Sequence, residues 1–189
     1  MQAAAIILAG GGSTRMGRNK AVLPWHGTPL IQHIADQLHP LFEAVLVSAN
    51  DAEVYSFLGL PIIQDRAPAQ GPLMGLYSAL AATAHDWNFV IACDIPVLSQ
   101  ALIESMYEQR DDVDCVVPIT PDGTREPLCA FYHRRLAATA QTLLYEGRRS
   151  VQSLLDKSKV RTVPLPSALP GINTPQQYEA FLLDSGSST

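Results

Sequence analysis

Short apolar runs alternate with longer segments of helical period along this chain, and this alternation constrains the fold more than any other feature. Residues 3–9 are apolar throughout, which is typical of a buried strand. Apolar residues then recur at helical spacing at Leu30, Ile31, Ile34 and Leu38. Strands without polar alternation belong to a sheet that is covered on both faces. The pattern therefore predicts an α/β fold, a three-layer α/β/α sandwich around a mostly parallel, Rossmann-like sheet.

The alternation continues almost to the end of the chain and accounts for one domain. Strands are predicted at residues 3–9, 44–48, 61–63, 89–93, 115–117, 128–132 and 160–163, and helices at 30–38, 53–58, 73–84, 100–109, 136–145, 151–155 and 174–183. With 189 residues, of which 47% are hydrophobic, the chain is long enough to fill one substantial core. We therefore expect a single domain over residues 1–184 and a frayed polar tail at 185–189.

The charge and the cysteine content argue against several classes of protein. Charged residues make up 16% of the chain and the formal net charge is -5, so the composition does not indicate binding to nucleic acid or to a membrane surface. The three cysteines have neither a disulfide-framework pattern nor zinc-knuckle spacing. The start of the chain lacks the features of a signal peptide, and no apolar run has the length of a membrane span. We expect a soluble protein in a reducing cytoplasm.

A glycine-rich segment, "LAGGGSTRMGRNKAVL" (Leu8–Leu23), contains four glycines and three cationic side chains. It fails the Walker pattern because Gly17 is followed by Arg18 and Asn19 instead of a lysine and a hydroxyl residue. It fails the Rossmann fingerprint because Arg15 stands where the third glycine belongs. Glycines after a strand still allow an anion to approach backbone N–H groups closely. The segment therefore indicates a phosphate site, with a solvated surface loop as the alternative.

Two aspartates follow predicted strands, at the edge of the sheet where α/β proteins bind ligands. Asp94 ends the apolar run in "VIACDIPVLS" and is a candidate ligand of Mg²⁺, which takes carboxylate oxygens and completes its shell with water and phosphate. Asp65 ends a short strand in "QDRAPAQGPLMGL", where the glycines would let a base or ribose approach the main chain. Both segments also have a purely structural explanation. Asp94 could be a turn residue or a helix cap, and the segment after Asp65 could be a turn followed by a helix that packs through its small residues.

These segments together resemble a known family. "LAGGGSTRMGRNKAVLPWHGTPLIQHI" is similar to the opening signature of nucleotidyltransferases of the nucleotide-diphospho-sugar transferase type. Further matching segments follow in family order and cover nearly the whole chain: "LVSAN", "IIQDRAPAQGPLMGL", "ACDIPVL", "DGTREPLCAFY", "EGRRSV" and "GINTPQQY". The last two segments narrow the resemblance to the molybdenum cofactor guanylyltransferase (MobA) family. This resemblance implies transfer of GMP from GTP to the terminal phosphate of molybdopterin or Mo-molybdopterin, with Mg²⁺ as cofactor and release of pyrophosphate.

The resemblance also implies roles for particular residues. The expected nucleotide site consists of residues at the carboxyl edge of the sheet: Leu8, Ala9, Gly10, Gly11, Lys20, Ser48, Asn50, Asp65 and Asp94. The expected catalytic residues are Arg15, Lys20 and Asp94: the two cations would neutralise the triphosphate and the leaving pyrophosphate, and Asp94 would hold the metal. Asp65 would accept hydrogen bonds from guanine or hold the ribose. Ser48 stands where the family often has asparagine, and keeps a hydroxyl but not the amide.

The choice of base and the pterin site also depend on the resemblance. Cytidylyl relatives tend to have alanine at the position of Gly10, and a missing Cβ leaves room for the larger purine, so GTP is favoured over CTP. For the anionic pterin, the family context points to Arg125, Arg148 and Arg149, and Asn173 would support either the metal or the incoming phosphate of the pterin. Solvated charges at a helix end are the alternative for the arginines. Molybdoenzymes or their chaperones are expected transient partners.

Two other functions remain open from the sequence. One is a CTP-dependent molybdopterin cytidylyltransferase, or another small-molecule nucleotidyltransferase with the same opening segment. The other is a non-catalytic binding partner that keeps the fold. The presence of both Lys20 and Asp94 favours an enzyme over the second alternative.

Overall fold

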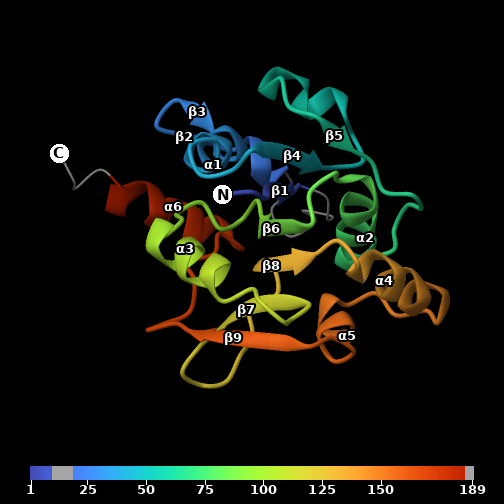
Figure 1. Ribbon diagram of the computed structural model, residues 1–189. Coiled ribbons are helices and arrows are strands. Elements are labelled where there is room, and N and C mark those ends of the chain that lie inside the picture. Colours follow the sequence, from blue (N-terminus) through green and yellow to red (C-terminus); the bar gives the residue numbers. More distant parts are fainter. Residues whose placement is uncertain (10–18, 186–189) are drawn as a thin grey trace.

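The computed structural model describes residues 1–9 and 19–185 of the chain. Its centre is a seven-stranded sheet with the strand order β5-β4-β1-β6-β8-β7-β9 (Figure 1). The strands are β1 (Ala4–Leu8), β4 (Ala44–Ser48), β5 (Ile62–Ile63), β6 (Trp87–Ala92), β7 (Cys115–Ile119), β8 (Cys129–His133) and β9 (Val160–Pro164). A separate hairpin consists of β2 (Pro24–Trp25) and β3 (Thr28–Pro29).

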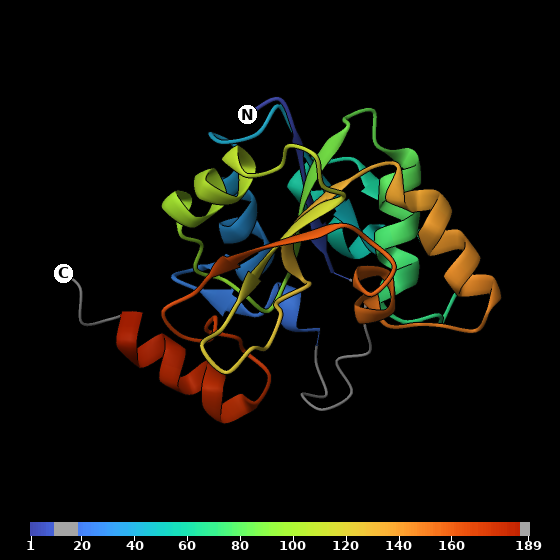
Figure 2. The same ribbon diagram turned by 60° about the horizontal axis from the view of Figure 1, so that its bottom comes forward.

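Helices cover both faces of this sheet. The α-helices are α1 (Leu30–Leu38), α2 (Pro72–Ala82), α3 (Gln100–Glu108), α4 (Leu136–Tyr145), α5 (Val151–Leu155) and α6 (Pro175–Ser185), and the 3-10 helices are η1 (Lys20–Val22) and η2 (Glu53–Leu58). Figure 2 shows α1 and α3 on one face and α2 and α4 on the other. The predicted three-layer sandwich is therefore confirmed. Within residues 1–9 and 19–185, no helix is long and apolar enough to cross a membrane.

The sheet is mostly parallel, as the sequence predicts. β1 pairs in parallel with β4 and β6, β4 with β5, and β7 with β9. β8 is antiparallel to both of its neighbours, β6 and β7. The apolar pattern does not indicate this reversal, because a buried strand has the same composition in either direction.

The first strand shows why its apolar run is continuous. Successive side chains of a strand point to opposite faces of the sheet. Ala5 and Ile7 lie in the cluster that includes residues of α1 and α3, whereas Ile6 and Leu8 lie in the cluster of α2, α4 and α5. All four are less than 10% exposed. A polar residue at any of these positions would therefore be buried without water on either face.

The β2–β3 hairpin was not predicted from the sequence. Its strands are only two residues long and pair in antiparallel register, so they contain too little alternation to identify. The turn between them places His26 at φ 48° and Gly27 at φ 84°. Two successive residues with positive φ are typical of the tight turns that join hairpin strands. The hairpin lies against α6, because Trp25, Leu23 and Phe181 belong to one apolar cluster.

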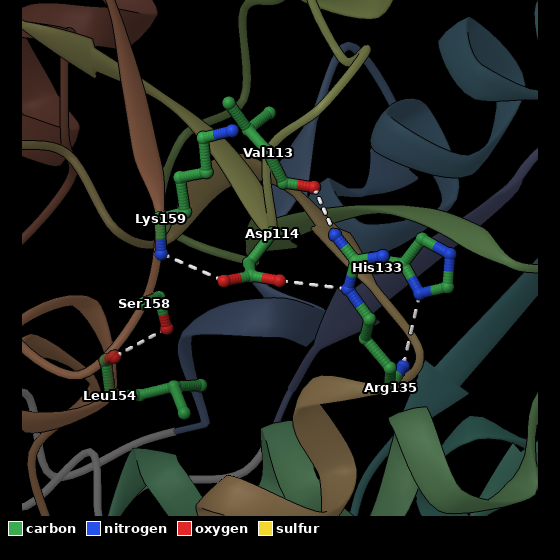
Figure 3. A network of polar contacts seen from close by, with 7 residues as sticks. All are labelled: Val113, Asp114, His133, Arg135, Leu154, Ser158 and Lys159. Atoms are coloured by element: carbon green, nitrogen blue, oxygen red, sulfur yellow. Dashed lines mark hydrogen bonds and ion pairs between the residues drawn. The ribbon is translucent and has the colours of Figure 1, made fainter.

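A polar network joins β7, β8 and β9 at the edge of the sheet where β7 begins (Figure 3). One oxygen of the Asp114 carboxylate accepts a hydrogen bond from Arg135 Nε at 2.8 Å, and the other accepts one from the Lys159 N–H at 2.7 Å. Arg135 also donates to the Val113 carbonyl at 2.6 Å. Burial alone would raise the pKa of Asp114, but these hydrogen bonds and the Arg135 charge outweigh it and leave the pKa lowered.

Replacement of Asp114 by asparagine is expected to lower the free energy of unfolding at pH 7 by about 1–2 kcal/mol, because charge-assisted hydrogen bonds are lost. A lowered carboxylate pKa stabilises the fold above the ordinary pKa of aspartate, about 3.9, and the effect disappears as the pH falls through the lowered value. Urea unfolding at pH 7 and in acid measures this difference, with exposed Asp111→Asn as control. A difference that is equally large in acid would contradict the electrostatic explanation.

Candidate active site

The carboxyl ends of β1, β4 and β6 lie side by side at one edge of the sheet. Leu8, the last residue of β1, pairs in parallel register with Ser48 of β4 and with Ala92 of β6. Asn50 and Asp94 follow these two partners by two residues each. The strands therefore bring residues of three different loops to one edge, which is where an α/β sheet binds its ligands.

Asn50 and Asp65 form a reciprocal pair at this edge. Asn50 Nδ2 donates to Asp65 Oδ2 at 3.0 Å, and the Asp65 N–H donates to Asn50 Oδ1 at 3.1 Å. Ser48, which is only 2% exposed, donates from its hydroxyl to the Gly75 carbonyl at 3.4 Å. A Cβ on Gly75 would lie 3.3 Å from Ser48 Oγ and 3.5 Å from Asp65 Oδ1. A side chain at Gly75 would thus press on Ser48 Oγ and contact Asp65 Oδ1.

The start of α2 is fixed against the segment that precedes α5. Gly71 has φ 73° and ψ -177°, a backbone conformation that is essentially restricted to glycine. A Cβ at this position would lie 3.0 Å from the Arg149 carbonyl oxygen, which also accepts a hydrogen bond from the Leu73 N–H at 3.2 Å. The glycine therefore allows both the turn and the close approach of the two backbones.

Lys20 and Asn173, which are far apart in the sequence, meet beside Asp94. Lys20 Nζ donates to Asn173 Oδ1 at 3.1 Å, and the Ile172 N–H donates to the Asp94 carbonyl at 2.8 Å. Burial raises the pKa of the Asp94 carboxyl, and the positive charge of Lys20 and a backbone hydrogen bond oppose that shift. An aspartate with a raised pKa at the shared carboxyl edge of these strands is a candidate functional group.

Glu126 precedes β8 at this same edge and was not singled out from the sequence. Burial raises the pKa of Glu126, and the charges of Asp122 and Asp94 raise it further. The Ala92 N–H donates to the Leu128 carbonyl at 2.8 Å, so the residues before β8 lie beside the end of β6. Glu126 could be found from the sequence only if β8 were known to run antiparallel to β6. Only in that direction does the N-terminal end of β8 lie at the edge where β6 ends.

The predicted pterin-binding arginines have different surroundings. Arg125 lies 3.5 Å from the Asp156 carboxylate. Arg149 Nη1 donates to the carbonyls of Leu144 and Arg148, each at 3.0 Å. The alternative of a charge that stabilises a helix end thus describes Arg149 well, because Leu144 lies in the last turn of α4. Arg148 is exposed, and its side chain has no hydrogen bond or ion pair within the described part of the chain. Pterin binding by these arginines stays a prediction.

Comparison with known proteins decides the family. Residues 5–162 match the MobA-like NTP transferase domain. The chain belongs to the MobA-like NTP transferase family. A "Probable molybdenum cofactor guanylyltransferase" of Carboxydothermus hydrogenoformans is 34% identical over 185 residues, which cover 93% of each chain. A "Molybdenum cofactor guanylyltransferase" of Shewanella piezotolerans is 32% identical over 182 residues, which cover 93% of this chain and 89% of the relative.

A solved structure supports the fold of this MobA-like NTP transferase. The crystal structure of molybdopterin-guanine dinucleotide biosynthesis protein A from Archaeoglobus fulgidus is similar with a TM-score of 0.83 and 21% sequence identity. The similarity covers 97% of this chain and 98% of that one. At this identity the likeness shows the fold alone. The family resemblance stated from the sequence motifs is confirmed by the family match, and with it the general activity of a nucleotidyltransferase.

Some predicted residues of this MobA-like NTP transferase lie beyond what the structure describes. Gly10, Gly11 and Arg15 fall between residues 9 and 19, so the roles expected of them stay predictions. The remaining nucleotide and metal candidates lie on the segments at the carboxyl edge of β1, β4, β5 and β6. Nucleotidyl transfer depends on positioning and charge neutralisation more than on a protein nucleophile, and a lysine, carboxylates and amides are suitable groups for that task.

Proposed function

We propose that this chain transfers GMP from GTP to the terminal phosphate of molybdopterin, with release of pyrophosphate. The observation that carries the proposal is the hydrogen bond of 3.1 Å from Lys20 Nζ to Asn173 Oδ1, because it joins the glycine-rich segment to the "GINTP" motif beside Asp94. The names of the relatives from Carboxydothermus and Shewanella support the choice of substrates, since each aligns with 93% of this chain.

Asp65 and Asn50 are the proposed base-selecting groups. Because Asn50 Nδ2 donates to Asp65 Oδ2, the carboxylate has a fixed orientation, and Gly75 places no Cβ against its Oδ1. Guanine presents two adjacent N–H donors, on N1 and N2, whereas cytosine presents a single exocyclic amine. A fixed carboxylate accepts two parallel hydrogen bonds well, so this pair favours GTP over CTP.

The residues beside β6 fit a divalent cation. Asp94 is a partly buried carboxylate whose raised pKa reflects the cost of its charge there, and Glu126 adds a second carboxylate close by. The described residues contain no cluster of three or more His, Cys, Asp or Glu side chains suited to a metal. This set suits Mg²⁺, which usually keeps several waters and takes phosphate oxygens as further ligands. We propose that Asp94 holds Mg²⁺, which would supply charge neutralisation at the phosphates.

The protein side chains would act by orienting and neutralising the reactants. In the proposed reaction a phosphate oxygen of molybdopterin forms a bond to the α-phosphorus of GTP, and the bond from that phosphorus to the bridging oxygen of the β-phosphate breaks. Lys20 would stabilise the negative charge that develops on the departing pyrophosphate. Asn173 would hold the lysine ammonium in place through the hydrogen bond described above. Arg148 is the proposed partner of the pterin phosphate, because its exposed guanidinium is available to an anion.

The substrate pair is tested by measuring pyrophosphate release with GTP, CTP, ATP and UTP, each with and without molybdopterin. We expect release only when molybdopterin is present, and at least about tenfold faster with GTP than with CTP, since two hydrogen bonds discriminate by roughly that factor or more. A preference for CTP would contradict the guanylyl assignment. Release that does not depend on molybdopterin would contradict the proposed acceptor.

Two further measurements address the acceptor and the partners. Adding molybdate shows whether Mo-molybdopterin is the better acceptor, and purified molybdoenzymes test the expected transient partners.

A further inference from the structure

The hydroxyl group of Tyr55 connects two segments that the sequence separates. Tyr55 lies in η2 and is only 2% exposed. Its hydroxyl donates to the Ala9 carbonyl at 3.0 Å and accepts a hydrogen bond from Asn19 Nδ2 at 2.9 Å. Ala9 follows β1, and Asn19 precedes η1. One phenol oxygen therefore joins the two ends of residues 10–18, the centre of the glycine-rich segment.

A tyrosine is well suited to this position. The contact requires one group that donates to a carbonyl and accepts from an amide at the same time, and a phenol does both. Burial raises the pKa of Tyr55, although the hydrogen bond from Asn19 opposes the shift. The hydroxyl therefore stays protonated at neutral pH and keeps its ability to donate to Ala9.

The same contacts continue to Lys20. Asn19 Oδ1 accepts a hydrogen bond from the Ala21 N–H at 3.1 Å and so caps η1, the short helix that begins with Lys20. On the other side, the Ala9 N–H donates to the Ser48 carbonyl at 2.9 Å, which fixes Ala9 to the edge of the sheet. Tyr55 therefore links the start of η1, through Asn19, to Ala9 at the end of β1. Lys20, the first residue of η1, donates from this position to Asn173.

We infer that Tyr55 is a positioning residue that holds Lys20 in place for the triphosphate. The inference rests on the proposed function only in taking Lys20 as a phosphate-binding residue. A side chain that is fixed before the ligand arrives loses less conformational freedom on binding, so fixing Asn19 and the start of η1 favours phosphate binding by Lys20. Tyr55 would act through Asn19, which it contacts, and the start of η1, which Asn19 caps.

The test measures the dissociation constant of GTP for wild type, Tyr55→Phe, Lys20→Met and the double variant. Tyr55→Phe keeps the ring and removes only the hydroxyl. We expect it to weaken GTP binding about tenfold, the effect of losing one or two net hydrogen bonds. In the Lys20→Met background the same change is expected to have less than about a twofold effect, because residues that act through one another are not additive.

Tyr132→Phe is the matched control. The Tyr132 hydroxyl is also buried and donates to a backbone carbonyl, that of Pro127, at 2.7 Å, but it contacts neither Ala9 nor Asn19. It should lower stability to urea while leaving GTP binding unchanged. The inference is overturned if Tyr55→Phe binds GTP as wild type does, if its effect is equally large without Lys20, or if Tyr132→Phe weakens binding as much. Because the readout is triphosphate binding, it is independent of whether GMP transfer to molybdopterin is observed.

Discussion

Replacement of Asp94 by asparagine is expected to lower kcat/KM for nucleotide transfer by on the order of a thousandfold, the loss typical of removing a group that stabilises transition-state charge. The amide keeps the size of the side chain but has no charge with which to hold a divalent cation. Initial rates at a series of Mg²⁺ concentrations measure the effect, and we expect the Mg²⁺ concentration for half-maximal rate to rise as well. Exposed Asp36→Asn, on α1, is the control.

The stability of Asp94→Asn shows whether a loss of activity comes from the missing metal-binding charge or from partial unfolding. Burial raises the pKa of Asp94, so the native state binds its proton more tightly than the unfolded chain does. Such a carboxylate makes folding less favourable as the pH rises from the ordinary pKa of aspartate, about 3.9, through the raised native pKa, and the cost is then fully present at neutral pH. At neutral pH the asparagine variant should therefore be at least as stable as wild type in urea. Activity within a few-fold of wild type would contradict the metal-binding role, and a large loss of stability would contradict the stated cause of the pKa shift.

Replacement of Lys20 by methionine is expected to reduce kcat/KM by on the order of a hundredfold or more, because one cation facing the developing phosphate charge is lost. The lysine ammonium also opposes the rise in the pKa of Asp94, so its removal makes the ionised carboxylate still less favourable. Steady-state rates and GTP binding measure the two effects. We expect Lys20→Arg to recover part of the activity, since the guanidinium keeps the charge but changes the geometry.

Exposed Lys157→Met provides the matched control for Lys20→Met. It removes the same charge from the surface, in the segment after α5, and should change kcat/KM by less than about twofold. If Lys157→Met were as harmful as Lys20→Met, net charge and not the local contact with Asn173 would explain the loss. Normal activity of Lys20→Met would contradict the phosphate-binding role of the glycine-rich segment.

The elements of the central sheet could be predicted because each forms from local pattern. Strand 44–48 was predicted with the observed bounds, Ala44–Ser48, and the strand predicted at 89–93 is β6, Trp87–Ala92. The direction of β8 and the β2–β3 hairpin could not be predicted. Direction depends on pairing with distant strands, and the hairpin is too short for an alternating pattern. Both depend on tertiary contacts that composition does not record.

The candidate site also contains residues that the sequence could predict and residues that it could not. Asp65 and Asp94 could be found because each follows an apolar strand, and the carboxyl ends of parallel strands share an edge. The contact between Lys20 and Asn173 joins residues separated by 153 positions, and only the family resemblance suggested that both serve one site. Tyr55 and Glu126 carry no local signal, because a tyrosine in a short helix and a glutamate before a strand are common in any surface segment.

The reversal of β8 has a consequence for how this fold can diversify. Because β7 ends and β8 begins at the edge where β1, β4 and β6 end, the connection from residue 120 to 128 lies at the edge of the candidate site, with both of its ends anchored in adjacent strands. A connection of this kind can be lengthened, shortened or exchanged between relatives without altering the register of the sheet. Because this connection carries Arg125, a predicted pterin ligand, and Glu126 of the proposed metal site, its exchange would change both surroundings together, while Asn50 and Asp65 lie on other segments and would stay in place.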